Sequence, residues 1–282
     1  MYTRFEAAPA GYGVDYRGLE LLAYEPDTTG RGCPPLLFVH GAFAGAWCWQ
    51  THYLPYFAGL GHAAYAVSLR GHGASAGRET LNQAGLNDFV DDVASAVDEL
   101  GEPPVLVGHS MGGLVVDMAL RRGVPAEAGV FLAAVPPTGM APSALQMMVG
   151  QPHLLWQMGV LQGFGPDWVD VDQAQHALFA DTPGPDAVLE YTSRMQPESQ
   201  WALFEMGFPR WPRWGHLHIP VAVLGAEEDA IIPPWMVRTT AWWHGVDPIW
   251  IPGAGHAMML EPGWRRSAAI LQGALEEMGV SC

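Results

Sequence analysis

The sequence has few cysteines, few basic residues and no long apolar run, and each shortage excludes a class of protein. Its three cysteines, Cys33, Cys48 and Cys282, are irregularly spaced over 282 residues and form no Cys-x-x-Cys pair. Such an odd, scattered set is typical neither of a disulfide framework nor of a zinc site, so we expect free thiols. A chain of this length, 49% hydrophobic, can bury a large core without such crosslinks.

Basic residues are outnumbered by acidic ones. The 13 Lys and Arg against 29 Asp and Glu give a formal net charge of −16. This charge repels phosphate backbones and anionic lipids, so we expect neither nucleic-acid binding nor stable membrane association. The first residues hold no apolar signal segment, and no run approaches the ~18 apolar residues of a membrane span. We therefore expect a cytoplasmic protein that acts on a small molecule; a homodimer remains open.

Short apolar segments alternate with helical segments along most of the chain. Strands are predicted at 35–40, 63–71, 104–108, 128–135, 220–229 and 248–255, after an antiparallel edge hairpin within 13–26. Helices are predicted at 47–60, from 87, at 111–121, 235–243 and 263–278, and Asn87 can cap the second. Apolar strands separated by helices indicate an α/β fold with a doubly wound, mostly parallel sheet.

This alternation is interrupted after Pro136 and Pro137. Residues 138–214 contain helical pieces broken by Gly and Pro, rich in Met and Trp, with no strand pattern. We predict a helical cap over the carboxyl ends of the strands, inserted into a core formed by 1–137 and 215–282. Its apolar side chains suit a hydrophobic substrate, and Met148 and Trp156 are predicted to contact it. Packing of the cap on the core would explain the same residues.

The segment Gly108-His109-Ser110-Met111-Gly112-Gly113 joins a predicted strand to a predicted helix. In that context G-x-S-x-G predicts a sharp turn that exposes the serine, with glycines where side chains would collide. The start of the following helix would favour a developing oxyanion. Ser110 is therefore the predicted nucleophile.

A serine nucleophile needs a base, and His256 is the histidine best placed to be one. It follows the last predicted strand on a glycine-flanked loop. Asp229 ends the strand before it and would orient the imidazole. Glu227 and Glu228 are adjacent rivals, but strand alternation and the following turn favour Asp229.

Two backbone N–H groups must face the oxyanion. Met111, next after the nucleophile, supplies one. The other is expected from the loop His40-Gly41-Ala42-Phe43, whose small residues let the backbone approach the substrate. Ala42 is preferred and Phe43 is the alternative; Phe43 is also expected to contact substrate.

Together, HGAFAGAWCW, SLRGHGAS, GHSMGG, LGAEEDAIIP and PGAGHAMMLEP resemble the α/β-hydrolase superfamily, in family order and over nearly the whole chain except the cap. The opening block and the cap are similar to the cofactor-free esterase and lysophospholipase-like branch. The resemblance implies a Ser110–Asp229–His256 triad, an oxyanion hole at Ala42 and Met111, and no metal or cofactor. Serine at 110 argues against the family's epoxide hydrolases and haloalkane dehalogenases, whose nucleophile is aspartate.

The expected reaction is hydrolysis of a carboxylic ester or lactone of a small-to-medium apolar substrate, through an acyl-enzyme. The same residues could serve a cofactor-free lyase, a C–C hydrolase or a perhydrolase. A receptor that binds its ligand and turns it over slowly is the alternative outside enzymology.

Overall fold

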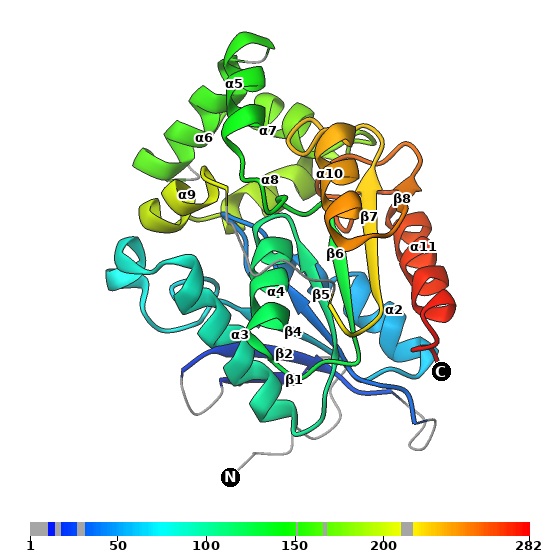
Figure 1. Ribbon diagram of the computed structural model, residues 1–282. Helices are drawn as coiled ribbons and strands as arrows, with labels where there is room; N and C mark the ends of the chain where they lie inside the picture. The colour runs from blue at the N-terminus through cyan, green and yellow to red at the C-terminus, as the bar shows by residue number, and fades with distance from the viewer. Residues whose placement is uncertain (1–10, 15–17, 27–31, 151, 166–167, 210–216) are drawn as a thin grey trace.

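A computed structural model describes residues 11–14, 18–26, 32–150, 152–165, 168–209 and 217–282. In this part of the chain an eight-stranded sheet has the order β1-β2-β4-β3-β5-β6-β7-β8 (Figure 1). The strands are β1 (Gly11–Val14), β2 (Glu20–Tyr24), β3 (Leu36–Val39), β4 (Ala64–Ser68), β5 (Val105–His109), β6 (Ala128–Leu132), β7 (Val221–Ala226) and β8 (Pro248–Ile251). β2 pairs antiparallel with both β1 and β4, and the remaining pairs are parallel. The predicted edge hairpin and mostly parallel sheet are confirmed.

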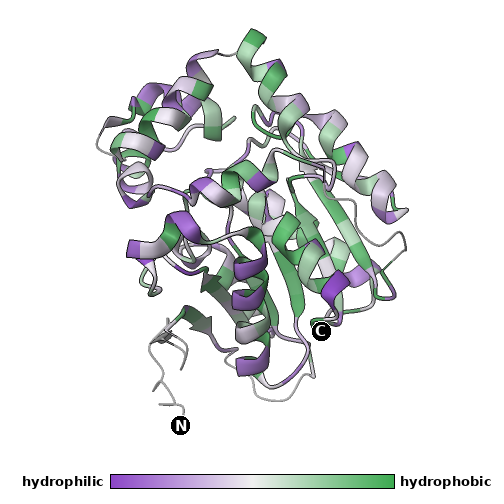
Figure 2. Ribbon diagram, turned by 60° about the vertical axis from the view of Figure 1, so that its left-hand side comes forward, coloured by the Kyte–Doolittle hydropathy of each residue, from purple (hydrophilic) through white to green (hydrophobic). Residues whose placement is uncertain are grey.

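Both faces of the sheet are buried: every residue of the central strands β3 and β5 is shielded from solvent, and apart from Gly108 and His109 these residues are apolar (Figure 2). In β3, Leu36 and Phe38 pack into one core, whereas Leu37 and Val39 pack into the other. Helices α1 (Trp47–Gln50), α2 (Tyr53–Leu60) and α11 (Trp264–Glu277) contribute to the first core, and α3 (Leu86–Leu100), α4 (Met111–Arg122) and α10 (Pro234–His244) to the second. No helix in the described ranges is long and apolar enough to cross a bilayer.

Helix α3 starts differently from the prediction. Gly85, not Asn87, is its N-cap residue, so the predicted cap is wrong. Asp88 reaches back and accepts the Gly85 N–H at 2.8 Å. The N–H of the next residue, Leu86, donates to the carboxylate of Glu205 at 2.7 Å. Glu205 belongs to a helix 119 residues further along the chain. A local pattern could not have revealed this second partner.

A helical insert lies between β6 and β7, as predicted. It contains α5 (Ala141–Gly150), α6 (Pro152–Phe164), α7 (Val171–Leu178), α8 (Pro185–Arg194) and α9 (Gln200–Met206). These helices gather at one end of the sheet (Figure 1). Of the predicted cap, residues 138–214, positions 151, 166–167 and 210–214 lie outside the described residues.

Hydrogen bonds identify the end of the sheet that the insert covers. Gln196 N–H donates to the carbonyl of Phe43, in the loop after β3, and the Ala257 N–H, in the loop after β8, donates to Leu178. Ser143 Oγ donates to the carbonyl of Ile231, after β7. All three loops follow the carboxyl ends of parallel strands, so the insert covers the edge where ligands bind in such sheets.

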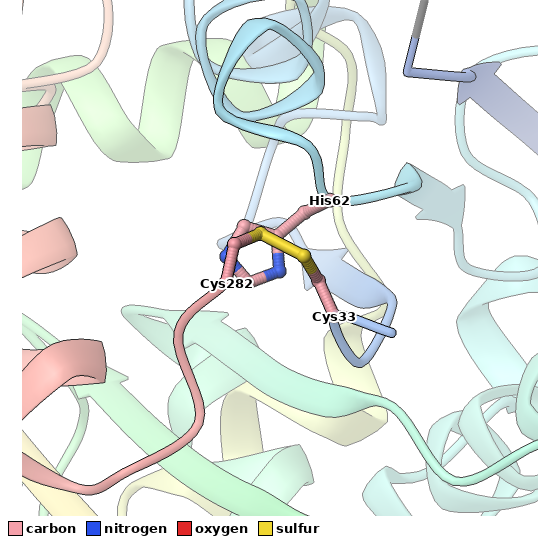
Figure 3. Close-up of side chains that lie close together, drawn as sticks. All are labelled: Cys33, His62 and Cys282. Carbon is pink, nitrogen blue, oxygen red and sulfur yellow. A yellow bond between two sulfur atoms is a disulfide. The ribbon is translucent and has the colours of Figure 1, made fainter. Parts of the chain in front are cut away.

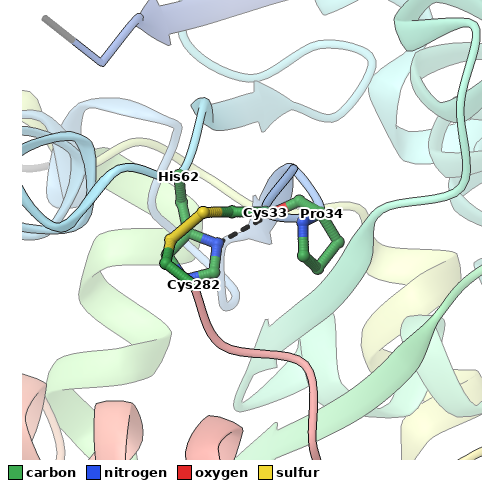
Figure 4. Close-up of a disulfide and its surroundings, with 4 residues drawn as sticks. All are labelled: Cys33, Pro34, His62 and Cys282. Atoms are coloured by element: carbon green, nitrogen blue, oxygen red, sulfur yellow. Dashed lines mark hydrogen bonds between the residues drawn. A yellow bond between two sulfur atoms is a disulfide. The ribbon is translucent and has the colours of Figure 1, made fainter. Parts of the chain in front are cut away.

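The expectation of three free thiols is wrong. Cys33 and Cys282 form a disulfide that links residues 249 positions apart (Figure 4). Cys48 is a free, buried thiol. The disulfide joins the segment before β3 to the segment after α11. Spacing could not predict the pair, because only the packing of α11 against the sheet brings the two segments together.

Reduction of this disulfide should destabilise the protein, since it frees a very long loop in the unfolded chain. We expect the Cys33→Ser and Cys282→Ser variants to lose about 3 kcal/mol of unfolding free energy in denaturant titrations. Dithiol treatment should reproduce the loss in the wild type, and the Cys48→Ala variant should respond to dithiol as the wild type does. Equal stability of oxidised and reduced protein would contradict the prediction.

Candidate active site

Ser110 occupies a sharp turn between β5 and α4. Its φ of 53° and ψ of −118° are angles that residues with a side chain rarely adopt. A Cβ on Gly108 would collide with the carbonyl of Gly112, and a Cβ on Gly112 with the carbonyl of His40. Close packing of β5, α4 and the end of β3 therefore requires these glycines and holds Ser110 at the carboxyl edge.

His256 and Asp229 form a buried pair. The imidazole Nδ1 lies 2.8 Å from Asp229 Oδ2, and both residues are largely shielded from solvent. The other carboxylate oxygen, Oδ1, accepts the backbone N–H groups of Ile231 and Ile232, each at 2.8 Å. A carboxylate fixed in this way accepts the Nδ1–H and leaves Nε2 as the proton acceptor.

His109 connects the serine turn to the His256 loop. Its Nε2–H donates to the backbone carbonyl of His256 at 2.9 Å, and the two rings are 4.6 Å apart between centroids. Burial, with a smaller contribution from His256, lowers the pKa of His109 well below its usual value, so the ring is neutral. Because Ser110 is the next residue, this contact fixes the His256 loop beside the serine turn.

The loop after β3 passes directly against the nucleophile. A Cβ on Gly41 would lie 2.9 Å from the Ser110 Cβ, so glycine is needed for the close approach. Phe43 has a φ of 64°, and its N–H points to Glu198 Oε2 at 3.4 Å. The amide of Phe43 is therefore directed into the cap, which favours Ala42 over Phe43 as the donor to an oxyanion.

At the other donor position, Met111 is the first residue of α4. Its N–H has no acceptor within the helix because the first four amides of any helix lack one. The positive end of the helix dipole reinforces that amide beside Ser110. Met111 thus carries a helix-start amide directly after Ser110, while Gly41, the residue before Ala42, packs against the serine.

Glu198 and His72 form a second buried carboxylate–histidine pair, which the sequence did not reveal. His72 Nε2 lies 3.0 Å from Glu198 Oε2, and neither side chain is exposed. Burial alone would lower the pKa of His72, but Glu198 outweighs that effect and raises it. Glu198 lies 126 residues from His72 in the chain, so no local pattern could reveal the pair.

Gln196 attaches the cap to the same loops. Its side-chain Nε2–H donates to the Gly71 carbonyl at 2.7 Å, and its side-chain Oε1 accepts the Gly73 N–H at 3.0 Å. Its backbone N–H donates to the Phe43 carbonyl at 3.1 Å. Gln196 and Glu198 therefore hold the Phe43 loop from the side of the cap. Their hydrogen bonds join distant parts of the chain, so the sequence could not predict them.

His40 is a second buried histidine, whose ring centroid lies 5.0 Å from that of His72. Its Nδ1–H donates to the Gly41 carbonyl at 2.8 Å, and its Nε2 accepts the Leu69 N–H at 3.0 Å. Burial, followed by the proximity of His72, lowers the pKa of His40 to about 3. The neutral ring therefore links the end of β3 to the end of β4.

The two cap residues that were predicted to contact substrate have exposed side chains in the structure. Met148 and Trp156 are 61% and 72% exposed, whereas Met147 is buried beside Leu155. Adjacent helical positions point about 100° apart, which is why Met147 is buried while its neighbour Met148 is exposed. Phe43, the third predicted contact, is buried at the site itself.

The chain is similar to known hydrolases. The pattern of the alpha/beta hydrolase family matches residues 36–267. Methylesterase 2 of Arabidopsis thaliana is 27% identical over 219 residues, covering 72% of this chain and 82% of that protein. Monoacylglycerol lipase of Mycolicibacterium smegmatis is 26% identical over 241 residues, covering 82% of this chain and 81% of the lipase.

The fold agrees with these matches. The solved structure of a thermophilic esterase from Thermogutta terrifontis has a TM-score of 0.70 to this chain at 20% identity. The match covers 98% of this chain and 100% of the esterase.

Because His40 is buried in its neutral form, it should make the protein less stable as the pH falls. Its folded pKa is far below that of an unfolded histidine, so the stability it contributes is complete above about pH 6.5 and declines as pH falls toward 3. We expect His40→Asn, whose shorter side chain can replace Nδ1 but places no acceptor at the position of Nε2 for the Leu69 N–H, to cost about 2 kcal/mol at pH 7.5. Denaturant titrations should show a smaller deficit at pH 5. A deficit that grows at low pH would contradict this assignment.

Proposed function

The chain belongs to the alpha/beta hydrolase family, and we propose that it is a serine hydrolase that cleaves carboxylic esters through an acyl-enzyme. The observation that carries the proposal is the His256–Asp229 pair, joined at 2.8 Å and attached through His109 to the serine turn. A histidine oriented by a fixed carboxylate beside a serine is the arrangement that activates a hydroxyl as nucleophile.

In the proposed reaction Ser110 Oγ attacks the ester carbonyl carbon while its proton moves to His256 Nε2. Negative charge develops on the carbonyl oxygen, where the N–H groups of Ala42 and Met111 stabilise it. His256 then protonates the leaving alcohol as the carbon–oxygen bond breaks. Water, activated by the same imidazole, hydrolyses the acyl-enzyme and restores Ser110.

Asp229 is favoured over its neighbours by position. It is buried and bonded to His256, whereas Glu227 and Glu228 are exposed. Because the Asp229 carboxylate also accepts two backbone amides, it remains fixed when the imidazole becomes charged. Only this acid can select the tautomer that accepts the serine proton.

The relatives support an ester of small-to-medium size as substrate. Two of the relatives are named methylesterase and monoacylglycerol lipase, and both names describe carboxylic ester hydrolases. We propose that the cap limits the size of the acyl or alcohol group, because it is bonded to the loops that border Ser110. A panel of esters and lactones of increasing chain length would measure this limit.

The nucleophile is tested by Ser110→Ala. We expect its turnover of an aryl ester to fall by at least about 10³-fold, with an unchanged unfolding curve, because only binding and oxyanion stabilisation remain. A fluorophosphonate probe should label the wild type and leave the variant unlabelled. Wild-type labelling without turnover of any ester or lactone would instead indicate a receptor or another acyl-transfer reaction.

The acid is tested by a matched pair of neighbouring substitutions. Asp229→Asn should lower kcat by about 10³- to 10⁴-fold, since the amide favours the wrong imidazole tautomer. Glu228→Gln makes the same change on an exposed side chain one residue away, and should leave kcat close to the wild-type value. The opposite order of severity would show that Asp229 is not the orienting acid.

A further inference from the structure

Cys33, Cys282 and His62 lie together at the amino end of the sheet (Figure 3). Cys33 comes just before β3, and His62 just before β4. Both parallel strands run from this corner toward the edge that carries Ser110, so the cluster and the proposed active site lie at opposite ends of the strands. The proposed hydrolysis uses none of these three side chains.

The three side chains are spaced for one metal ion. Their donor atoms, two Sγ and one imidazole nitrogen, all lie within 4.8 Å of one another. Zinc bonds of about 2.3 Å to sulfur and about 2.0 Å to nitrogen place two donors at most about 4.6 Å apart across one ion. Small side-chain rotations would therefore bring all three within bonding distance.

His62 is oriented as metal-binding histidines usually are. Its Nδ1–H donates to the Pro34 carbonyl at 2.8 Å, and the residue is only 3% exposed (Figure 4). A carbonyl partner on one ring nitrogen fixes the tautomer and leaves the lone pair of the other, Nε2, available as a ligand. This bond joins His62 to the residue next to Cys33, so ring and thiol are held in the same corner.

We propose that this corner is a redox-dependent metal site that binds a soft divalent cation such as zinc when the disulfide is reduced. Reduction by a dithiol transfers two electrons and two protons to the Cys33–Cys282 bond, and the reductant becomes the disulfide. Zinc then displaces the two thiol protons and takes two thiolates and His62 Nε2 as ligands. Water occupies the fourth position, on the side where Cys282 is exposed.

The oxidised protein and the reduced, metal-bound protein would both keep the segments around Cys33 and Cys282 joined, but by different bonds. Under oxidising conditions the disulfide links the segment after α11 to the segment before β3. Under reducing conditions, as in the cytoplasm expected from the sequence, the metal would bridge the same segments. This inference revises the expectation that the cysteines form no zinc site, and it does not depend on the proposed ester hydrolysis.

The test uses the whole protein, reduced and freed of metal, titrated with Co²⁺ as a spectroscopic probe and with Zn²⁺. We expect one Co²⁺ per chain with a thiolate-to-cobalt charge-transfer band, which Zn²⁺ abolishes. Zn²⁺ should also raise the Tm of the reduced protein toward that of the oxidised protein, and a chelator should reverse the rise. Ester hydrolysis should stay the same throughout.

Three variants separate this site from other metal binding. His62→Asn retains a donor for the Pro34 carbonyl but lacks the Nε2 ligand, and Cys282→Ser lacks one thiolate; both should lose the charge-transfer band and the Tm rise. Cys48→Ala, which removes the buried free thiol, should retain both. The oxidised His62→Asn protein, held by its disulfide, shows whether the substitution itself disturbs folding.

Two results would overturn the proposal. The first is a reduced wild type with no charge-transfer band at micromolar Co²⁺. The second is a band that persists unchanged in Cys282→Ser or in a His62→Asn protein whose oxidised Tm is normal. Because neither result involves Ser110, failure here would leave the proposed hydrolase activity intact.

Discussion

The site around Ser110 depends on the very close packing of β5, α4 and the end of β3. The backbones at Gly108, Gly112 and His40 approach so closely that no Cβ fits between them. This contact imposes the unusual backbone angles of Ser110 and places the Gly41 backbone against the serine. One packing contact therefore positions both Ser110, the proposed nucleophile, and the loop that carries Ala42, the proposed oxyanion donor.

Around that contact the structure arranges two buried carboxylate–histidine pairs with different surroundings. In the His256–Asp229 pair the carboxylate is fixed by two amides and holds the imidazole through Nδ1, and Nε2 is the proposed proton acceptor. In the His72–Glu198 pair the carboxylate raises the pKa of the imidazole and is also within reach of the Phe43 amide. The first pair suits proton transfer, whereas the second holds the cap on the core.

The cap is therefore part of the site as well as its cover. Glu198 and Gln196 belong to the insert, yet they bond to loops that begin at β3 and β4. A shift of the cap would move the Phe43 loop and with it the neighbouring Ala42 amide. At the opposite end of the strands, the Cys33–Cys282 disulfide joins the segments before β3 and after α11.

The sequence by itself determined the local features. Apolar runs and helical periodicity predicted the strand order along the chain, and the G-x-S-x-G segment predicted the turn at Ser110, because these signals arise from residues close together. The sequence also placed Asp229 and His256 at strand ends, which parallel strands bring to one edge.

Only the tertiary structure decided the long-range pairings. Glu198 with His72, Cys33 with Cys282, and Leu86 with Glu205 join residues more than 100 positions apart, so no local pattern records them. The orientation of the cap helices was also a tertiary result, and Met147 rather than Met148 faces inward. The physical reason is the same in each case: contacts between distant segments depend on how completed helices and strands pack.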